Sequence, residues 1–303
     1  LGLRFSVPWT ALLPTSMDIQ SALEITVNKL LPMDYETMLE PLVEKLCLAA
    51  NETEGKHIVD TWFMMDKPWP MLTILAAYLY FVLKLGPKLM DNRKPMELKK
   101  LLLVYNGAHV LYSSWWLHKV FSDEYICQYY FKSACYPSSL EMSLVPKANI
   151  AYDTVAWLYL MSKFLELSDT IFFVLRKKQN QISFLHLYHH TIMVAGTWAF
   201  LKYIRGSQTI FIGVINTAIH VAMYSYYLLA ALGPKVQKYL WWKRYLTTMQ
   251  LVQFLCVLVY LVSLLLMRCD VKKEFIIFCV INTLTFFILF SNFYIKTYTK
   301  KSK

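Results

Sequence analysis

The sequence predicts an all-α polytopic membrane protein with seven transmembrane helices. The chain has 303 residues, is 57% hydrophobic and has a mean hydropathy of +0.38. This apolar share exceeds that of ordinary soluble domains, and the excess falls in windows of about 20 residues, the length of a helix that crosses a bilayer. A formal charge of +11 would indicate nucleic acid in a soluble protein. Membrane topology explains the positions of these lysines and arginines, so the sequence predicts no nucleic-acid partner.

Residues 1–66 are mixed and polar, and they are predicted to form one lumenal segment. They contain no signal peptide with a cleavage site. Met17 is a candidate start, in which case residues 1–16 are a leader or an artefact of the gene model. Asn51 begins an Asn-Glu-Thr glycosylation sequon, which is usable if this end of the chain is lumenal.

Residues 67–295 contain seven apolar spans and are predicted to form one membrane domain. Residues 296–303 are then a basic tail. Each span has the length and composition of a bilayer-crossing helix. The predicted spans are Trp69–Leu85, Leu101–Leu117, Ile150–Val174, Leu185–Phe200, Thr209–Leu232, Tyr245–Met267 and Phe275–Tyr294.

The lysines and arginines orient these spans. Alternate loops and the C-terminal tail carry more than twice as many of them as the opposite loops, and the richer side is cytosolic by the positive-inside rule. The N-terminus is therefore predicted to be lumenal and the C-terminus cytosolic. Lys300 and Lys301 stand fourth and third from the end, as in a dilysine retrieval signal of the endoplasmic reticulum. A simple basic stop-transfer tail is the alternative.

This topology places Cys127, Cys135 and Cys269 in lumenal loops, on the oxidising side of the membrane. A disulfide from the second lumenal loop to the last would join distant spans. Either Cys127 or Cys135 pairs with Cys269, and the sequence leaves both open. The other three cysteines are interpreted as ordinary buried or solitary residues: Cys47, Cys256 and Cys279.

Three histidines form the most unusual group in the chain. His186, His189 and His190 lie at i, i+3 and i+4, so they share one face of a helix. Histidines at the edge of a membrane-length segment are costly unless they have a partner or a function. Solvation of a helix end is one interpretation. The others are a metal site, or a set of bases and nucleophiles.

Charged residues occur inside the third predicted span. Lys163, Glu166 and Asp169 lie at i, i+3 and i+6. Isolated charges here would each be costly, and adjacent turns let Lys163 and Glu166 compensate each other. A structural ion pair is therefore the alternative to a functional role for these two. Asp169 is better placed for function, because a carboxylate can fix a histidine tautomer and support an imidazolium.

Two further spans carry polar stripes. Asn216 and His220 lie at i, i+4 in the fifth span, and Tyr224 and Tyr227 continue the same stripe. The sixth span opens with Thr247, Gln250 and Gln253, each three residues apart. An aromatic stripe alone would indicate packing or lipid contact. The added histidine and amides predict a polar lining near the cytosolic half of the bundle.

Four motifs occur together in a fixed order. They are KxxExxDT from Lys163, HxxHH from His186, HxxMYxYY from His220 and TxxQxxQ from Thr247. With these motifs the chain resembles the fatty-acid elongase family (ELO, elongation of very long chain fatty acids) over roughly residues 60–300. The resemblance implies that six of the seven spans form an inverted barrel around a narrow acyl tunnel, closed at its lumenal end.

The resemblance also implies the condensing step of fatty-acid elongation in the endoplasmic reticulum membrane. Acyl-CoA and malonyl-CoA are the expected substrates, and no bound cofactor and no metal are expected. The reductases and the dehydratase of the elongation cycle are the expected partners, with membrane lipid around the protein and a homo- or hetero-oligomer possible.

Soluble condensing enzymes use a cysteine nucleophile, and none of the four motifs contains a cysteine. In line with the resemblance, His189 is expected to accept the acyl group as an acyl-imidazole. His220 assists proton transfer or positions malonyl-CoA. His186 and His190 orient the pair, with Asp169 accepting from a histidine.

The remaining motif residues are expected to bind substrate. The carboxamides of Asn216, Gln250 and Gln253 are candidates to hold thioester or enolate oxygens. Cations at the cytosolic level are candidates to pair with CoA phosphates, although the positive-inside rule already explains their presence. The further candidates are Lys163, Glu166, Tyr224, Tyr227, Lys235, Lys238, Lys243 and Arg244.

The main alternative is a membrane di-iron fatty-acyl desaturase or hydroxylase, whose sequences also contain HxxHH. Such enzymes need several histidine clusters to bind two metals, and this chain has only 7 histidines. His109 and His118 are interpreted as packing or capping residues. A seven-span receptor would not explain four polar motifs at the cytosolic end.

Overall fold

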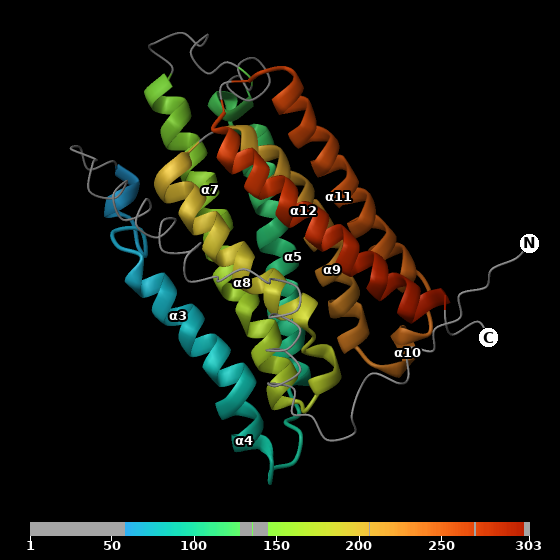
Figure 1. Cartoon of the computed structure of the whole chain (residues 1–303). Helices are drawn as coiled ribbons and strands as arrows, with labels where there is room; N and C mark the ends of the chain where they lie inside the picture. The colour runs from blue at the N-terminus through green and yellow to red at the C-terminus, as the bar shows by residue number, and fades with distance from the viewer. Residues whose placement is uncertain (1–57, 128–134, 136–144, 206, 270, 300–303) are drawn as a thin grey trace, which may run out of the picture. The chain divides into compact units, whose positions relative to one another are not determined.

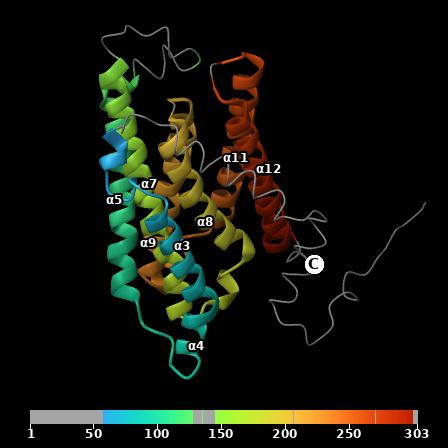
Figure 2. The same ribbon diagram turned by 60° about the vertical axis from the view of Figure 1, so that its left-hand side comes forward.

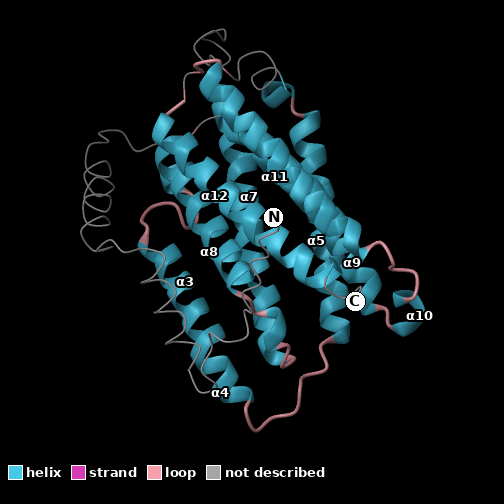
Figure 3. Cartoon of the chain, turned by 45° about the vertical axis from the view of Figure 1, so that its right-hand side comes forward, coloured by secondary structure: helices cyan, strands magenta, loops and turns pink. Residues whose placement is uncertain are grey.

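The computed structural model describes residues 58–127, 135, 145–205, 207–269 and 271–299. These residues form helices and connecting loops, with no strand in this part of the chain (Figures 1 and 3). The chain divides into two compact units, and the described residues belong to the second, His57–Lys303. Four predicted features lie outside the described residues: the sequon at Asn51, the interpretation of Cys47, residues 1–16 and the lysines at the end of the tail.

Helices occupy all seven of the predicted spans. In chain order they are α3 (Trp69–Tyr80), α5 (Lys99–Ser122), α7 (Val145–Leu175), α8 (Phe184–Ala199), α9 (Ile210–Ala231), α11 (Lys243–Leu266) and α12 (Lys273–Tyr294). Short elements connect or precede them: η1 (Ile58–Thr61), η4 (Gln179–Gln181), η6 (Ser207–Thr209) and α10 (Pro234–Gln237).

Three of the helices run on through a π-helical turn, which the apolar pattern alone did not predict. Helix α3 continues through η2 (Phe81–Leu85) into α4 (Gly86–Met90), so that one rod spans Trp69–Met90. Helix α8 continues through η5 (Phe200–Ile204), and α12 through η7 (Ile295–Thr299).

Four helical rods in the described part of the chain are long and apolar enough to cross a membrane: Trp69–Met90, α9, α11 and Lys273–Thr299. The other three predicted spans are helical but are shorter or more polar than these four rods. Helix α8 has 16 residues before its π-helical turn. Helix α7 buries Asp153, Lys163 and Glu166, and α5 buries Asn106 and His109. Seven membrane crossings therefore remain a prediction, and the more polar helices are those that carry the candidate site.

Contacts between distant segments show which loops share an end of the bundle. Lys202, in the π-helical turn η5 that follows α8, donates to Asp60, which precedes α3, at 2.7 Å. Cys135, which precedes α7, forms a disulfide with Cys269, which precedes α12. At the other end, Lys177 after α7 donates to the carbonyl of Asp91 after α4. The loops thus alternate between two ends, as the prediction of alternating spans requires.

Helix α9 packs closely against α5. A Cβ atom at Gly213 would lie 3.4 Å from Cη2 of Trp116, so a larger residue would crowd this crossing. The Trp116 indole donates to the carbonyl of Val155 at 2.8 Å and so ties α5 to α7 as well. Helix α3 packs on the outer side of α7 and α8, where Leu75 and Tyr78 meet a core that includes Leu160 (Figure 2).

Candidate active site

A cavity of about 170 Å³ lies among six of the seven helices. Its wall is mostly apolar, and none of its lining residues comes from α3. The lining includes Trp116 of α5, Tyr152 and Tyr159 of α7, His189, Met193 and Gly196 of α8, Ile210 and Asn216 of α9, Gln253 and Val257 of α11, and Cys279, Asn282 and Phe286 of α12.

Aromatic pairs stand at two levels of this cavity. The ring of His189 contacts Phe286, with centroids 5.3 Å apart. The ring of Phe200 contacts Phe275, with centroids 4.9 Å apart. Since α8 and η5 run from His189 to Phe200 and α12 runs from Phe275 to Phe286, these pairs lie toward opposite ends of the cavity.

Three of the predicted site residues line the cavity: His189, Asn216 and Gln253. His189 makes ring contacts with His190 and Phe286 but no hydrogen bond with any described residue. Gln253 is 6% exposed, and its carboxamide also has no partner in the described part of the chain. A buried amide without a protein partner is costly, so this wall offers polar groups to a ligand.

The other histidines of the HxxHH motif are held by protein groups. Ser183 caps α8 by accepting from the backbone N–H of His186 at 3.2 Å, which starts the helix just before the motif. The His186 ring Nε2 lies 2.8 Å from Oγ1 of Thr170, and that hydroxyl lies 2.7 Å from the phenol of Tyr78. His190 is buried against His186, with ring centroids 4.4 Å apart. Neither histidine lines the cavity.

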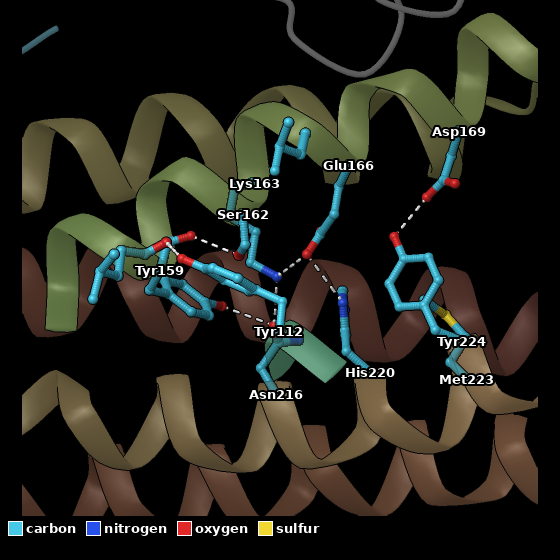
Figure 4. A network of polar contacts seen from close by, with 12 residues as sticks. Tyr112, Tyr159, Ser162, Lys163, Glu166, Asp169, Asn216, His220, Met223 and Tyr224 are labelled. Atoms are coloured by element: carbon cyan, nitrogen blue, oxygen red, sulfur yellow. Dashed lines mark hydrogen bonds and ion pairs between the residues drawn. The ribbon is translucent and has the colours of Figure 1, made fainter. Parts of the chain in front are cut away.

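Lys163 and Glu166 form the predicted i, i+3 ion pair. Lys163 Nζ lies 2.7 Å from Glu166 Oε1, and the two side chains are 2% and 3% exposed (Figure 4). Lys163 also donates to Oδ1 of Asn216 at 3.0 Å, and Tyr159 donates to the same oxygen at 2.8 Å. His220 Nδ1 lies 3.1 Å from Glu166 Oε1. The ion pair of α7 therefore contacts two side chains of α9.

The structure gives Asp169 a different partner from the one expected. Asp169 was expected to accept from a histidine, but its Oδ2 accepts from the phenol of Tyr224 at 2.7 Å (Figure 4). The carboxylate that contacts a histidine is Glu166. Spacing along α7 identifies both carboxylates as candidates, but it does not determine which of them meets α9 at His220.

His220 lines a second cavity rather than the large one. This cavity measures about 10 Å³ and is lined by polar side chains of α5, α7 and α9, among them Ser113, Lys163, Glu166 and Thr217. His189 and His220 therefore occupy the walls of two neighbouring cavities. Tyr159 and Trp116 line both, so they form part of the partition between them.

The remaining predicted residues lie away from the large cavity. Gln250 Nε2 is 4.0 Å from Sδ of Met223, and Tyr227 contacts the ring of Tyr224. The predicted cations of the α9–α11 connection are exposed: Lys235, Lys238, Lys243 and Arg244. Two of these cations stack on the tyrosine that follows each in the chain.

Several residues of the site were not predicted. Tyr159 precedes Lys163 by four residues, so helical spacing places both on one face, and this was a usable signal. His109 lines neither cavity, and its ring stacks on Tyr224 with centroids 4.4 Å apart, in agreement with its interpretation as a packing residue. Cys279 was interpreted as an ordinary residue, yet it lines the large cavity. Its lone position in the sequence gave no signal of this.

Asn282 was also missed, and it adds a polar link between two helices that share aromatic contacts. Its Oδ1 accepts from the phenol of Tyr188 at 2.7 Å, which links α12 to α8 beside the cavity. Asparagine in an apolar span was the available signal, since such residues need a partner.

The structure pairs Cys135 with Cys269, the second of the two alternatives that the sequence left open. Cys127 is a free thiol whose sulfur lies 3.3 Å from the carbonyl of Phe121. No group of three or more histidine, cysteine, aspartate or glutamate side chains is arranged to hold a metal ion within the described ranges. A di-iron centre needs several such ligands, so these residues offer no donor set for the desaturase interpretation.

The fold and the cavity define a helical membrane protein with an apolar chamber and a histidine and three carboxamides in its wall: His189, Asn216, Gln253 and Asn282. The chain belongs to the GNS1/SUR4 family (ELO), which matches residues 63–303. This confirms the resemblance drawn from the four motifs.

Named relatives agree with this assignment. The chain is 44% identical over 239 residues to very long chain fatty acid elongase 7 of Drosophila melanogaster, covering 78% of this chain and 71% of the relative. It is 43% identical over 244 residues to very long chain fatty acid elongase 7 of Rattus norvegicus, covering 80% and 85%. It is 41% identical over 247 residues to very long chain fatty acid elongase 4 of Homo sapiens, covering 81% and 76%.

Proposed function

We propose that this protein is a very-long-chain 3-oxoacyl-CoA synthase, the condensing enzyme of fatty-acid elongation. It converts acyl-CoA, malonyl-CoA and a proton into 3-oxoacyl-CoA, CO2 and free CoA, and so adds two carbons to long and very long acyl chains. The observation that carries this proposal is that His189 is the one motif histidine in the wall of the large apolar cavity, and its ring nitrogens have no hydrogen-bond partner among the described residues.

In the first half-reaction a ring nitrogen of His189 attacks the thioester carbonyl. A C–N bond forms, the C–S bond breaks, and CoA leaves as a thiolate that takes a proton from water. The proton released by the His189 ring is relayed through water to His220, which lines the neighbouring small cavity. The acyl chain occupies the apolar cavity, where Asn216 and Gln253 offer donors to the carbonyl oxygen as it gains negative charge.

In the second half-reaction malonyl-CoA loses CO2, and the resulting enolate carbon attacks the acyl carbonyl. A C–C bond forms and the C–N bond to His189 breaks. His220 returns the proton to the departing ring nitrogen, which restores both histidines. An acyl-imidazole suits this sequence because neutral imidazole is a competent nucleophile and its acyl adduct stays activated.

The proposed function also predicts the membrane in which the protein lies and its orientation there. The protein lies in the endoplasmic reticulum membrane with its N-terminus lumenal and its C-terminus cytosolic, and six helices form an inverted barrel around the acyl tunnel. The His189 end of the cavity faces the cytosol, where Lys235, Lys238, Lys243 and Arg244 are exposed and offer charges to CoA phosphates. The reductases and the dehydratase of the cycle act on its product.

The test separates His189 from the cysteine that shares its cavity. Wild-type protein is given acyl-CoA alone, and we expect release of free CoA and retention of the acyl group, detected by intact-protein mass spectrometry. His189→Ala should abolish both the adduct and the 3-oxoacyl product. Cys279→Ala, the matched control in the same cavity wall, should retain the adduct.

Two outcomes would overturn this assignment. An adduct that persists in His189→Ala and disappears in Cys279→Ala would make the cysteine the nucleophile. A wild-type protein that makes 3-oxoacyl-CoA with no adduct and no early CoA release would favour direct attack of the enolate on the bound thioester.

A further inference from the structure

The carboxylate of Glu166 on α7 contacts α9 at His220. Its Oε1 lies 2.7 Å from Lys163 Nζ and 3.1 Å from His220 Nδ1, while its Oε2 has no partner among the described residues (Figure 4). Glu166 does not line the large cavity. It therefore lies one layer behind the surface that an acyl chain would touch.

This contact determines which nitrogen of His220 carries a proton. An ionised carboxylate only accepts hydrogen bonds, so Nδ1 of His220 must be the N–H that points at Glu166. The lone pair of a neutral His220 is then on Nε2. The same carboxylate stabilises the ring when Nε2 takes up a second proton, because the charge that develops lies beside an anion.

Lys163 extends the arrangement to a second group. Its ammonium offsets the charge of Glu166 in a site from which water is almost excluded, and it donates to Oδ1 of Asn216. Tyr159 donates to that oxygen too. With Oδ1 accepting two hydrogen bonds, Nδ2 is the donor that Asn216 has left for the large cavity, which it lines.

Asn216 and His220 are one helical turn apart on α9, so one ion pair on α7 orients both. Resting on the proposed function, we propose that Glu166 and Lys163 are positioning residues rather than substrate ligands. Glu166 holds His220 with Nε2 as its proton-accepting nitrogen, and Lys163 presents the Asn216 amide to the acyl carbonyl. Glu166 then acts on the reaction through His220.

The second cavity is consistent with these separate roles for His189 and His220. It contains the Lys163, Glu166 and His220 side chains and has room for about one water molecule, but not for an acyl chain. His189 faces the larger, apolar space. The nucleophile is thus separated from the proton-carrying group and its counter-ion, which limits the access of water to the acylated histidine.

The test is a double-mutant cycle between Glu166 and His220. Glu166→Gln keeps the shape and an accepting oxygen but removes the charge that supports a protonated His220. We expect the rate of condensation in a single turnover with malonyl-CoA to fall by about 10²-fold, the lower range for lost acid–base catalysis. Adduct formation with acyl-CoA alone should change little, because the His189 proton can pass to water instead.

In a His220→Ala background, Glu166→Gln should cause no further loss of condensation. Groups that act through one another are non-additive, whereas a general structural role would reduce the rate again by a similar factor. Ser162→Ala is the matched control. Ser162 lines the same small cavity and donates only to the carbonyl of Tyr159, so its removal should leave the condensation rate unchanged.

A lone Glu166→Gln change leaves Lys163 as an uncompensated buried charge and can prevent folding. The double variant Lys163→Gln/Glu166→Gln removes both charges and keeps hydrogen-bonding amides, so it answers the question if the single variant does not fold. Either variant condensing at the wild-type rate overturns the proposal, as do losses that multiply in the His220→Ala background. A wild-type protein that makes neither adduct nor 3-oxoacyl-CoA would instead refute the proposed function.

Discussion

The phenol of Tyr224 and the carboxylate of Asp169 join α9 to α7 through a hydrogen bond of 2.7 Å. Tyr224 is fully buried, and its ring is stacked on His109 of α5, with centroids 4.4 Å apart and planes inclined by 17°. One tyrosine therefore connects three of the helices that surround the histidines. Asp169, the carboxylate expected to orient a histidine, instead holds this aromatic junction.

Replacing Tyr224 by Phe tests what this bond contributes. The ring and its stacking on His109 remain, but the half-buried Asp169 carboxylate loses the Tyr224 donor. We expect the free energy of unfolding to fall by about 1 kcal/mol, the lower end of the cost of an unsatisfied buried acceptor. Thermal unfolding of purified protein in detergent measures the effect. Tyr226→Phe is the control, and an equal shift in both variants would contradict a specific role for the Asp169 contact.

The disulfide leads to a second prediction. Cys135 and Cys269 lie before α7 and α12, so their bond closes a loop of 134 residues. Breaking such a bond typically costs about 2–5 kcal/mol. Cys135→Ser and Cys269→Ser should therefore lower the unfolding temperature by the same amount, and the double variant by no more than either. Cys127→Ser should have little effect; a loss as large as that of Cys135→Ser would show that Cys127 takes part in the bond.

The helices were predictable because apolar residues dominate windows of membrane length, and the loops that share an end follow from simple alternation. The Lys163–Glu166 pair was predictable because i, i+3 neighbours on one helix always meet. Contacts between helices were not predictable in the same way. Spacing shows that Asp169 and Glu166 share a face of α7. Only the rotation of α9 about its own axis determines that Tyr224 contacts Asp169 and His220 contacts Glu166.

The cavity shows the same limit. The polar stripes of α9 and α11 predicted a common lining; Asn216 and Gln253 do line the large cavity, whereas His220 lines the smaller one. Cys279 and Asn282 carry no such pattern, and their positions depend on how α12 packs against α8. The disulfide partner likewise depends on the path of a loop, and two lumenal cysteines eight residues apart satisfy the same topological rule.

Orientation in the membrane is a third prediction. The asymmetry of lysines and arginines and the disulfide on the Cys135 side both favour a lumenal N-terminus. In sealed microsomes, a C-terminal tag should be digested by added protease, and wild-type protein should carry a glycan that Asn51→Gln removes. A protected C-terminal tag would reverse the orientation and place the His189 end of the cavity in the lumen.

The last prediction concerns the depth of the large cavity. Phe200 lies eleven positions after His189 along α8 and η5, and Phe286 lies eleven positions after Phe275 along α12. At 1.5 Å of rise per residue, each helix gives a depth of roughly 16 Å. The rings of Phe200 and Phe275 meet at the end of the lining that is remote from His189, and we take this contact as the floor of the cavity. A bound acyl chain that outgrows this depth must displace one of the two rings.

Replacing Phe275 by Ala removes one ring from this floor and leaves Phe200 in place. We expect the longest product to gain at least one two-carbon unit, because the chain bound at His189 can extend further before it meets the floor. Product profiles from microsomes supplied with a series of acyl-CoAs measure the shift. Ile277→Ala is the matched control, since Ile277 lies two residues further on the same helix, is 53% exposed and does not line the cavity. An active Phe275→Ala enzyme with the wild-type product profile would show that the floor lies elsewhere, whereas a loss of all products in both variants would point to damage to α12 itself.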